Sequence, residues 1–151
     1  MKIAIGADHA GFELKQRLVE HLKGQGHQVQ DFGSNSPEPS DYPKFAFPVA
    51  ESVAQKQNDR GILICGNGIG MSIVANKVPG VRAALTMTEK MAKDTREHND
   101  SNVLVLAGRD LPDENNLKIT DIWLSTPFSN AERHARRVGE IQEIEKQIKQ
   151  S

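Results

Sequence analysis

The residues best placed to do chemistry lie in the stretch GILICGNGIGMSIVANK, residues 61–77. Cys65 is the only cysteine of the chain, and it stands where an apolar run meets a cluster of glycines. Gly66, Gly68 and Gly70 permit backbone angles that leave N–H groups facing a ligand, and the short helix expected after them adds the positive end of its dipole. A free cysteine is often only a small buried hydrophobe. In this setting it can also be a thiolate base beside a cradle for an oxyanion.

Two familiar phosphate-binding motifs do not fit the glycine loops. A dinucleotide fingerprint requires G-x-G-x-x-G, and Met71 occupies the position of the third glycine, although Glu89 lies at a suitable distance for a ribose contact. The first loop, residues 6–11, continues with Phe12 and Glu13, where a P-loop requires Lys and Ser or Thr. A flavodoxin-like nucleotide binder is therefore disfavoured.

Basic and polar side chains elsewhere could bind an anion or move a proton. In ERHARR, helical spacing places Arg133, His134 and Arg137 on one face at a helix start, which suits a phosphate, although such a charge run is often only a solvated face. His98 of EHND is open to two interpretations, a helix cap or a general acid. The five histidines show no metal-ligand spacing, so we expect no metal site. The other candidates follow strands or end a helix: Asp8, His9, Asn99 and Arg109.

Strand-like and helix-like segments alternate along the chain. The predicted helices cover residues 11–26, 44–57, 71–76 and 88–98, and a last helix ends near 149; possible capping boxes lie at Thr86 to Glu89 and Ser129 to Glu132. This alternation predicts an α/β protein, a three-layer α/β/α Rossmann-like domain with a five-stranded parallel sheet and an extra C-terminal helix. Ligands on such sheets bind at the carboxyl ends of the strands. The predicted strands are residues 2–6, 27–33, 61–66, 81–86 and 102–108.

Composition excludes several classes of protein. The 19 basic and 20 acidic residues give a net charge of −1, which argues against a broad nucleic-acid footprint. No apolar run reaches the roughly 18 residues of a membrane span, and the N-terminus becomes polar too soon for a signal peptide. One cysteine allows no intrachain disulfide. We therefore expect a soluble cytoplasmic protein with a single domain over residues 1–151.

With these motifs assembled, the chain resembles the type B ribose-5-phosphate isomerase family, which includes the galactose-6-phosphate isomerase subunits. The resemblance covers essentially the whole chain. It depends on six segments in order: GADHAGFELK, DYP, CGNGIGMSIVANKVPGVRAAL, EHND, NVLVLAGR and ERHARR.

The resemblance implies aldose–ketose isomerisation of a phosphorylated sugar through an enediolate, without a cofactor. Cys65 would move the proton between C2 and C1, and His98, aided by Asp8, would open the sugar ring. The resemblance also implies a sugar site lined by Tyr42 and Asn99 and an enediolate site formed by the backbone of Gly66, Asn67, Gly68, Ile69 and Gly70. It implies a phosphate site of His9, Arg109, Arg133, His134 and Arg137.

The family also implies a homodimer or tetramer whose active sites use two subunits, with the C-terminal helix, residues 130–149, packed on a neighbour. One residue departs from the family pattern: Asn67 stands where threonine or serine is usual. An amide can bind an oxyanion but cannot relay a proton as a hydroxyl does. Ribose 5-phosphate is the leading substrate; a hexose 6-phosphate, a tetrose phosphate, or a non-catalytic binding subunit are the alternatives.

Overall fold

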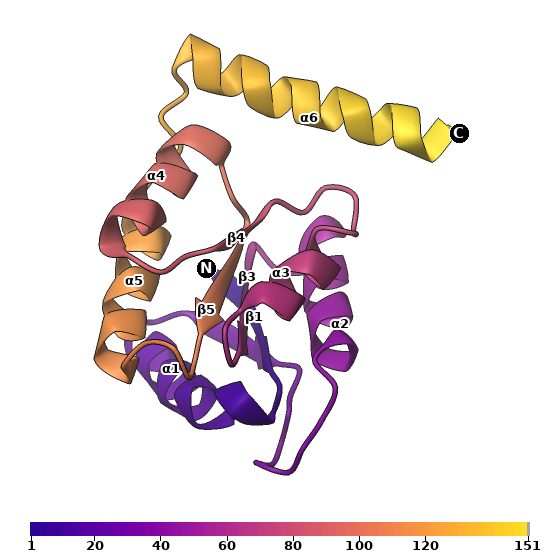
Figure 1. Ribbon diagram of the computed structural model, residues 1–151. Helices are drawn as coiled ribbons and strands as arrows, with labels where there is room; N and C mark the ends of the chain where they lie inside the picture. The colour runs from indigo at the N-terminus through magenta and orange to yellow at the C-terminus, as the bar shows by residue number, and fades with distance from the viewer. Residues whose placement is uncertain (151) are drawn as a thin grey trace.

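The computed structural model describes residues 1–150 and contains a five-stranded parallel sheet between layers of helices (Figure 1). The strand order is β2-β1-β3-β5-β4. The predicted fold class is confirmed, although β2 and β4 are shorter than the apolar runs that predicted them. The strands are β1 (Lys2–Ala7), β2 (Gln28–Asp31), β3 (Arg60–Cys65), β4 (Ala83–Leu85) and β5 (Val103–Ala107).

Helices cover both faces of the sheet and one lies outside them (Figure 1). One layer contains α1, α4 and α5, the other contains α2 and α3, and α6 crosses the top of the view beyond α4. The helices are η1 (His9–Gly11), α1 (Phe12–Gly24), α2 (Pro43–Ala54), α3 (Ile69–Ala75), α4 (Glu89–Asn99), α5 (Asp113–Ser125) and α6 (Glu132–Gln150). No helix among residues 1–150 is long and apolar enough to cross a bilayer.

The central strand β3 divides the apolar core into two halves. Successive side chains of a strand point to opposite faces, so Ile62 and Ile64 pack in the cluster under α1 and α5, while Leu63 and Cys65 pack in the cluster under α2 and α3. Both faces of β3 are buried, as a strand inside a doubly covered parallel sheet requires. The Cys65 side chain therefore points toward the layer that contains α3.

The strand order reverses direction between β1 and β3, because the chain leaves β1 toward β2 and returns to the other side of β1 for β3. In open α/β sheets such a switch point leaves a crevice at the carboxyl ends of the strands. Backbone hydrogen bonds connect the segments at the carboxyl ends of these strands. The Asp8 N–H donates to the Ile64 carbonyl at 3.2 Å, and the Gly108 N–H donates to the Cys65 carbonyl at 2.8 Å. The loops after β1, β3 and β5 are thus fixed beside one another.

One local prediction is wrong, and one helix was not predicted. The cap of α4 is Thr88, whose side chain accepts from the Met91 N–H at 3.0 Å, and Thr86 is instead buried, with its hydroxyl bonded to the Ala84 carbonyl. Helix α5 is absent from the predicted helices. Its buried face includes Asn116 and Thr120 as well as apolar residues, so its apolar period is weak in the sequence.

Helix α6 begins near the predicted position, but its start differs in detail. The Ser129 hydroxyl accepts from the Ala131 N–H at 3.2 Å, one residue earlier than a capping box with Glu132 requires. The helix packs on α4 through its first turns, where His134 and Val138 are buried.

Candidate active site

Cys65 ends β3 and is 4% exposed. The N–H groups of Gly66, Gly68 and Gly70, which follow it, donate to no group within residues 1–150. Gly68 has a φ of +80°, and a Cβ there would lie 2.4 Å from the Leu85 side chain, so this turn needs glycine. A thiol and several unsatisfied backbone donors therefore share one loop, which is the combination that a carbanion base and an oxyanion site need.

Asn67 shapes that loop. Its side-chain oxygen accepts from the Ile69 N–H at 3.0 Å, so the first donor of α3 is already bonded. The predicted oxyanion contact from Ile69 is therefore occupied in this conformation. Because the amide oxygen of Asn67 is used internally, its NH₂ group remains as the donor that can face a ligand.

Tyr42, at the N-cap of α2, lies directly on Gly70. A Cβ on Gly70 would lie 2.6–2.9 Å from three carbons of the tyrosine ring. Glycine at this position lets the ring approach the backbone, and the phenol, 39% exposed, lies against the loop that follows Cys65. The predicted sugar-site residue and the predicted oxyanion loop thus touch.

His9 is held by the loop that precedes α2. Its N–H donates to the Ser40 hydroxyl at 3.2 Å, and its Nδ1 accepts from the Ser40 N–H at 3.1 Å. Because Nδ1 accepts, the proton of the neutral ring is on Nε2, which can donate to a ligand. Ser40 was not among the predicted site residues; its neighbours in the long polar loop give no periodic signal, and only the pairing with His9 identifies it.

Asp8 and Arg109 flank the loop of Cys65 from the two neighbouring strands. Asp8 is 7% exposed, and its Oδ1 accepts from the Ala10 N–H at 2.9 Å. The Arg109 N–H donates to Gly66 at 2.9 Å, while its exposed guanidinium has no hydrogen-bond or ion-pair partner among residues 1–150. These residues form what we call the carboxyl-edge group: Asp8, His9, Tyr42, Cys65, Gly66, Asn67, Gly68, Ile69, Gly70 and Arg109.

The remaining predicted residues gather where α4 ends and α6 begins. The rings of His98 and His134 have centroids 4.4 Å apart, and the Ser129 hydroxyl lies 2.8 Å from Nδ1 of His134. His98 is exposed and His134 is buried beneath it. We call this second set the α4–α6 group: His98, Asn99, Arg133, His134 and Arg137.

The surroundings of His134 disfavour its charged form. Burial, followed by the positive charges of Arg133, His98 and Arg137, lowers the pKa of His134. A neutral His134 supports the ring of His98 without adding charge, which gives it a role besides the predicted phosphate contact. Arg133 and Arg137 are exposed and have no ion-pair partner among the described residues, so both guanidiniums can bind an anion.

The two groups lie at opposite ends of the strands, which we call the carboxyl edge and the amino edge of the sheet. Helix α4 starts after β4 at the carboxyl edge and returns the chain to Val103, the first residue of β5, at the amino edge. Cys65 pairs with Ala107 at the other end of β5. Four steps of roughly 3.3 Å separate the two ends, so about 13 Å along the strands lies between the groups within one chain.

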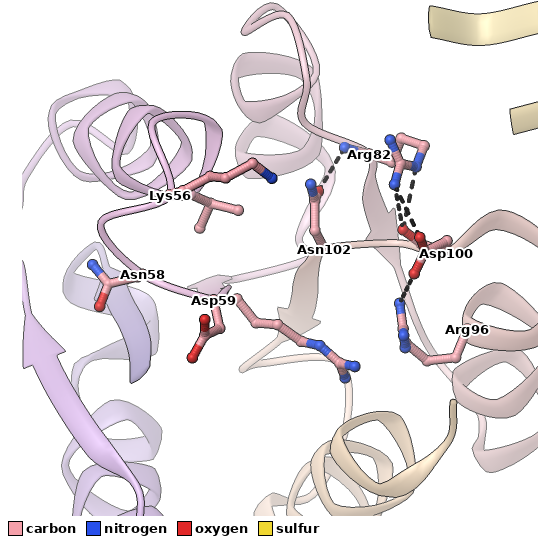
Figure 2. Close-up of a pocket in the computed structure, with 9 residues that line it drawn as sticks. Lys56, Asn58, Asp59, Arg82, Arg96, Asp100 and Asn102 are labelled. Carbon is pink, nitrogen blue, oxygen red and sulfur yellow. Dashed lines mark hydrogen bonds and ion pairs between the residues drawn. The ribbon is translucent and has the colours of Figure 1, made fainter. Parts of the chain in front are cut away.

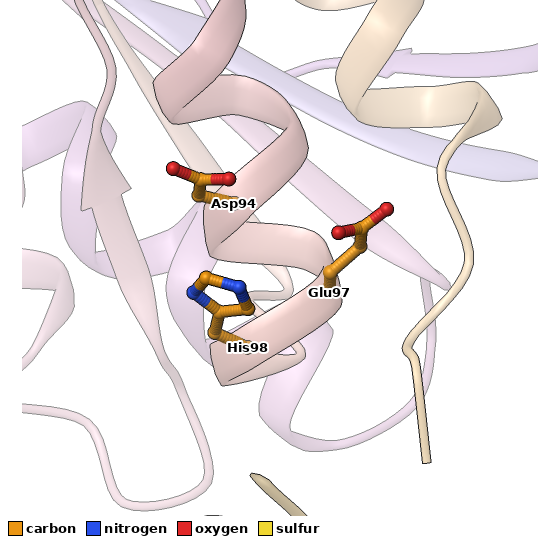
Figure 3. Close-up of side chains that lie close together, drawn as sticks. All are labelled: Asp94, Glu97 and His98. Carbon is orange, nitrogen blue, oxygen red and sulfur yellow. The ribbon is translucent and has the colours of Figure 1, made fainter. Parts of the chain in front are cut away.

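His98 also belongs to a cluster with Asp94 and Glu97 on α4 (Figure 3). Possible ligand atoms of the three lie within 4.8 Å of one another. Both carboxylates already pair along the helix, Asp94 with Lys90 and Glu97 with Lys93. The hydrogen bond from Lys90, with a contribution from His98, lowers the pKa of Asp94, so a carboxylate stays ionised beside the imidazole. The cluster is therefore better described as the electrostatic environment of His98.

The sheet and the glycine-rich loop at its switch point define a doubly wound α/β protein, a class in which ligands bind outside the carboxyl ends of the strands. The sequence profile described as Ribose/Galactose Isomerase matches residues 3–141. Ribose-5-phosphate isomerase B of Escherichia coli (strain K12) is 45% identical over 144 residues, which are 95% of this chain and 96% of that protein. The chain belongs to the ribose/galactose isomerase family, which includes the type B ribose-5-phosphate isomerases.

Solved structures agree with this assignment. Ribose-5-phosphate isomerase B of Clostridium thermocellum superposes with a TM-score of 0.95 at 50% identity, covering 98% of this chain and 99% of that one. The enzyme of Mycoplasma genitalium, solved with bound ribulose 5-phosphate, gives a TM-score of 0.92 at 45% identity and covers 96% of both chains.

Proposed function

We propose that this protein interconverts ribose 5-phosphate and ribulose 5-phosphate without a cofactor, with Cys65 as the base. The observation that carries the proposal is the loop after β3, where a buried thiol adjoins unsatisfied N–H groups. The proposed substrate follows from the family and from its similar members, which are named ribose-5-phosphate isomerase B, one of them solved with bound ribulose 5-phosphate. We propose that residues 1–151 act as one isomerase domain.

The proposed reaction starts with ring opening. A proton must reach the ring oxygen while the anomeric hydroxyl loses one, and His98 with Asp8 would exchange these protons. The Cys65 thiolate then removes the proton from C2 of the open aldose, and the electron pair of that C–H bond forms the C1–C2 double bond of the enediolate. The N–H groups of Gly66, Gly68 and Gly70 would stabilise the negative oxygen. The proton of the O2 hydroxyl moves to O1, and the thiol returns its proton to C1 as the electron pair on O2 forms the C2=O bond of the ketose, so the reaction needs no other reactant.

We propose that each active site takes its two halves from two copies of the chain. The carboxyl-edge group of one copy would provide the base and the oxyanion donors. The α4–α6 group of a second copy would provide His98, Asn99 and the phosphate-binding arginines. The support is geometric: the groups that the reaction needs together are about 13 Å apart along the strands in one chain.

Exposed apolar side chains also favour self-association. Phe47 on α2 and Ile73 on α3 are 51% and 55% exposed, and Ile141 and Ile144 of α6 are 39% and 53% exposed. Such apolar stripes on helices gain free energy when another surface covers them. We therefore propose a homodimer or tetramer in which α6 packs on a neighbouring copy.

Ketose formation from a panel of aldose phosphates tests the proposed substrate. We expect kcat/KM to be highest with ribose 5-phosphate when compared with allose 6-phosphate, galactose 6-phosphate and erythrose 4-phosphate. Preference for a hexose or tetrose phosphate would keep the mechanism and change the substrate. Binding of these sugars without turnover of any would contradict the enzymatic proposal and support a binding subunit.

Asn67 gives a separate prediction about the loop. In Asn67→Asp the side-chain oxygen can still accept from Ile69, but the NH₂ donor is replaced by a negative charge next to the developing enediolate. We expect kcat to fall by about 10²-fold, as when one oxyanion donor is removed, with little change in melting temperature. Asn67→Thr, which restores the usual hydroxyl, is the matched control and should retain turnover. Equal activity of the aspartate variant and the wild type would show that Asn67 only accepts the hydrogen bond from Ile69 at the start of α3.

A further inference from the structure

A polar cavity lies at the amino edge of the sheet, away from Cys65 (Figure 2). Its volume is about 260 Å³, slightly below the roughly 300–1,000 Å³ of sites for drug-sized ligands. Four cationic and two anionic side chains line it, an excess of two positive charges. The lining residues are Val53, Lys56, Asn58, Asp59, Arg60, Arg82, Arg96, Asp100 and Asn102.

Both carboxylates of this cavity are already engaged. Asp100 accepts from Arg96 at 2.8 Å and from Arg82 at 3.5 Å, as the dashed lines of Figure 2 mark. Asp59 accepts from the backbone N–H of Lys2 at 2.8 Å. Arg82 and Arg96 also donate to backbone carbonyls of the loop that ends α4. These two arginines are therefore satisfied inside the protein.

Lys56 and Arg60 are not satisfied in this way. Lys56 is exposed, its ammonium group has no hydrogen-bond or ion-pair partner among residues 1–150, and Figure 2 shows its side chain extending over the cavity toward Asn102. The guanidinium of Arg60 donates to the Trp123 carbonyl at 3.1 Å and lies 5.1 Å from the centroid of that indole, but it has no carboxylate within ion-pair distance.

The position of Arg60 is electrostatically unfavourable without a counter-ion. Burial and the neighbouring Arg96 lower its pKa to about 10. A guanidinium that has several unused N–H donors and no paired carboxylate is a favourable partner for a phosphate, which accepts charge-assisted hydrogen bonds from such groups. An anion in the cavity would offset the repulsion between the two arginines.

We propose that this cavity is a second anion site, selective for a doubly charged oxyanion, either inorganic phosphate or the phosphate group of a small metabolite. Lys56 and Arg60 provide the direct contacts, and the amide nitrogen of Asn102, which donates once to the Gly80 carbonyl, has a second N–H at the cavity wall. The site is independent of the proposed catalytic reaction, since its residues belong to neither the carboxyl-edge group nor the α4–α6 group.

The fluorescence of Trp123 can report binding at this site. Trp123 is the only tryptophan of the chain, is fully buried, and contacts Arg60. Titration with inorganic phosphate, at ionic strength held constant with chloride, should give a saturable change in tryptophan fluorescence. The background for the experiment is the double variant His9→Ala/Arg137→Ala, which removes two of the proposed phosphate contacts of the active site.

Lys56→Glu should raise the phosphate midpoint at least about 10-fold, since a charge-assisted hydrogen bond is replaced by repulsion. Lys56→Asn is the milder variant, because the φ of 61° at this position is one that asparagine adopts readily.

Glycerol 3-phosphate in the same titration separates the two sources: tighter binding than phosphate indicates a metabolite, and equal binding indicates the phosphate group alone. A fluorescence that does not saturate, a midpoint unchanged in Lys56→Glu, or loss of the signal in the double variant would overturn the proposal.

Discussion

Cys65→Ala should lower kcat for ribose 5-phosphate by about 10²–10⁴-fold, the range that a positioned acid or base contributes to proton transfer. The reason is chemical, because alanine has no group that can accept the proton from C2. KM should change little, since the proposed phosphate contacts come from other residues. Steady-state kinetics with ribose 5-phosphate, followed by ketose formation, measures both values.

The control for this prediction is Cys65→Ser, which keeps the shape of the side chain but replaces a thiol with a hydroxyl that is not ionised near neutral pH. Both variants should melt close to the wild type, since the side chain is small and its loss leaves little empty space. Retention of more than a tenth of kcat in Cys65→Ala would show that another group removes the proton. Equal losses in both variants, with ligand binding intact, would support the assignment.

The sequence predicts the carboxyl-edge group well because that group is determined by local signals. Apart from Tyr42, its residues end an apolar strand or follow one within a few positions, and parallel strands bring such positions to one edge. Asp8 and Arg109 follow β1 and β5, and Cys65 is the last residue of β3 between them; the hydrogen bonds between these segments show that they are neighbours. The strand alternation alone was sufficient to predict this.

The α4–α6 group is different, because its location depends on the direction in which a helix returns the chain. EHND can be recognised as a polar helix end, and a parallel sheet requires the helix before the strand at 102–108 to end at the amino edge, but the sequence does not state which segment packs against that end. The reciprocal bonds between His9 and Ser40, and the burial of His134 under His98, come from contacts between segments far apart in sequence. Periodicity contains no information on such contacts. The same limit explains α5, whose buried polar residues hide its helical period.

The distance between the two groups makes a second large effect testable. Cys65→Ala and His98→Ala should each be nearly inactive as homo-oligomers. Chains with the two substitutions, co-expressed with different affinity tags and purified as a hetero-oligomer, should recover about half of the wild-type activity if the assembly is a two-fold dimer, because one of two shared sites then contains both intact residues. Activity per oligomer, measured with ribose 5-phosphate, gives the result.

The matched control places both substitutions on one chain and pairs that chain with the wild type. In shared sites, each site of this second hetero-oligomer lacks either Cys65 or His98, so activity should be nearly absent. If each chain instead formed its own complete site, the two results would exchange: the control would keep about half of the activity and the complementing pair would have almost none. Composition, total charge and the number of substituted residues are the same in both assemblies. Only the distribution of the two residues between subunits differs, so a reversed result would contradict the proposed two-copy site. It would require a rearrangement that brings His98, at the C-terminal end of α4, to the carboxyl edge within one chain.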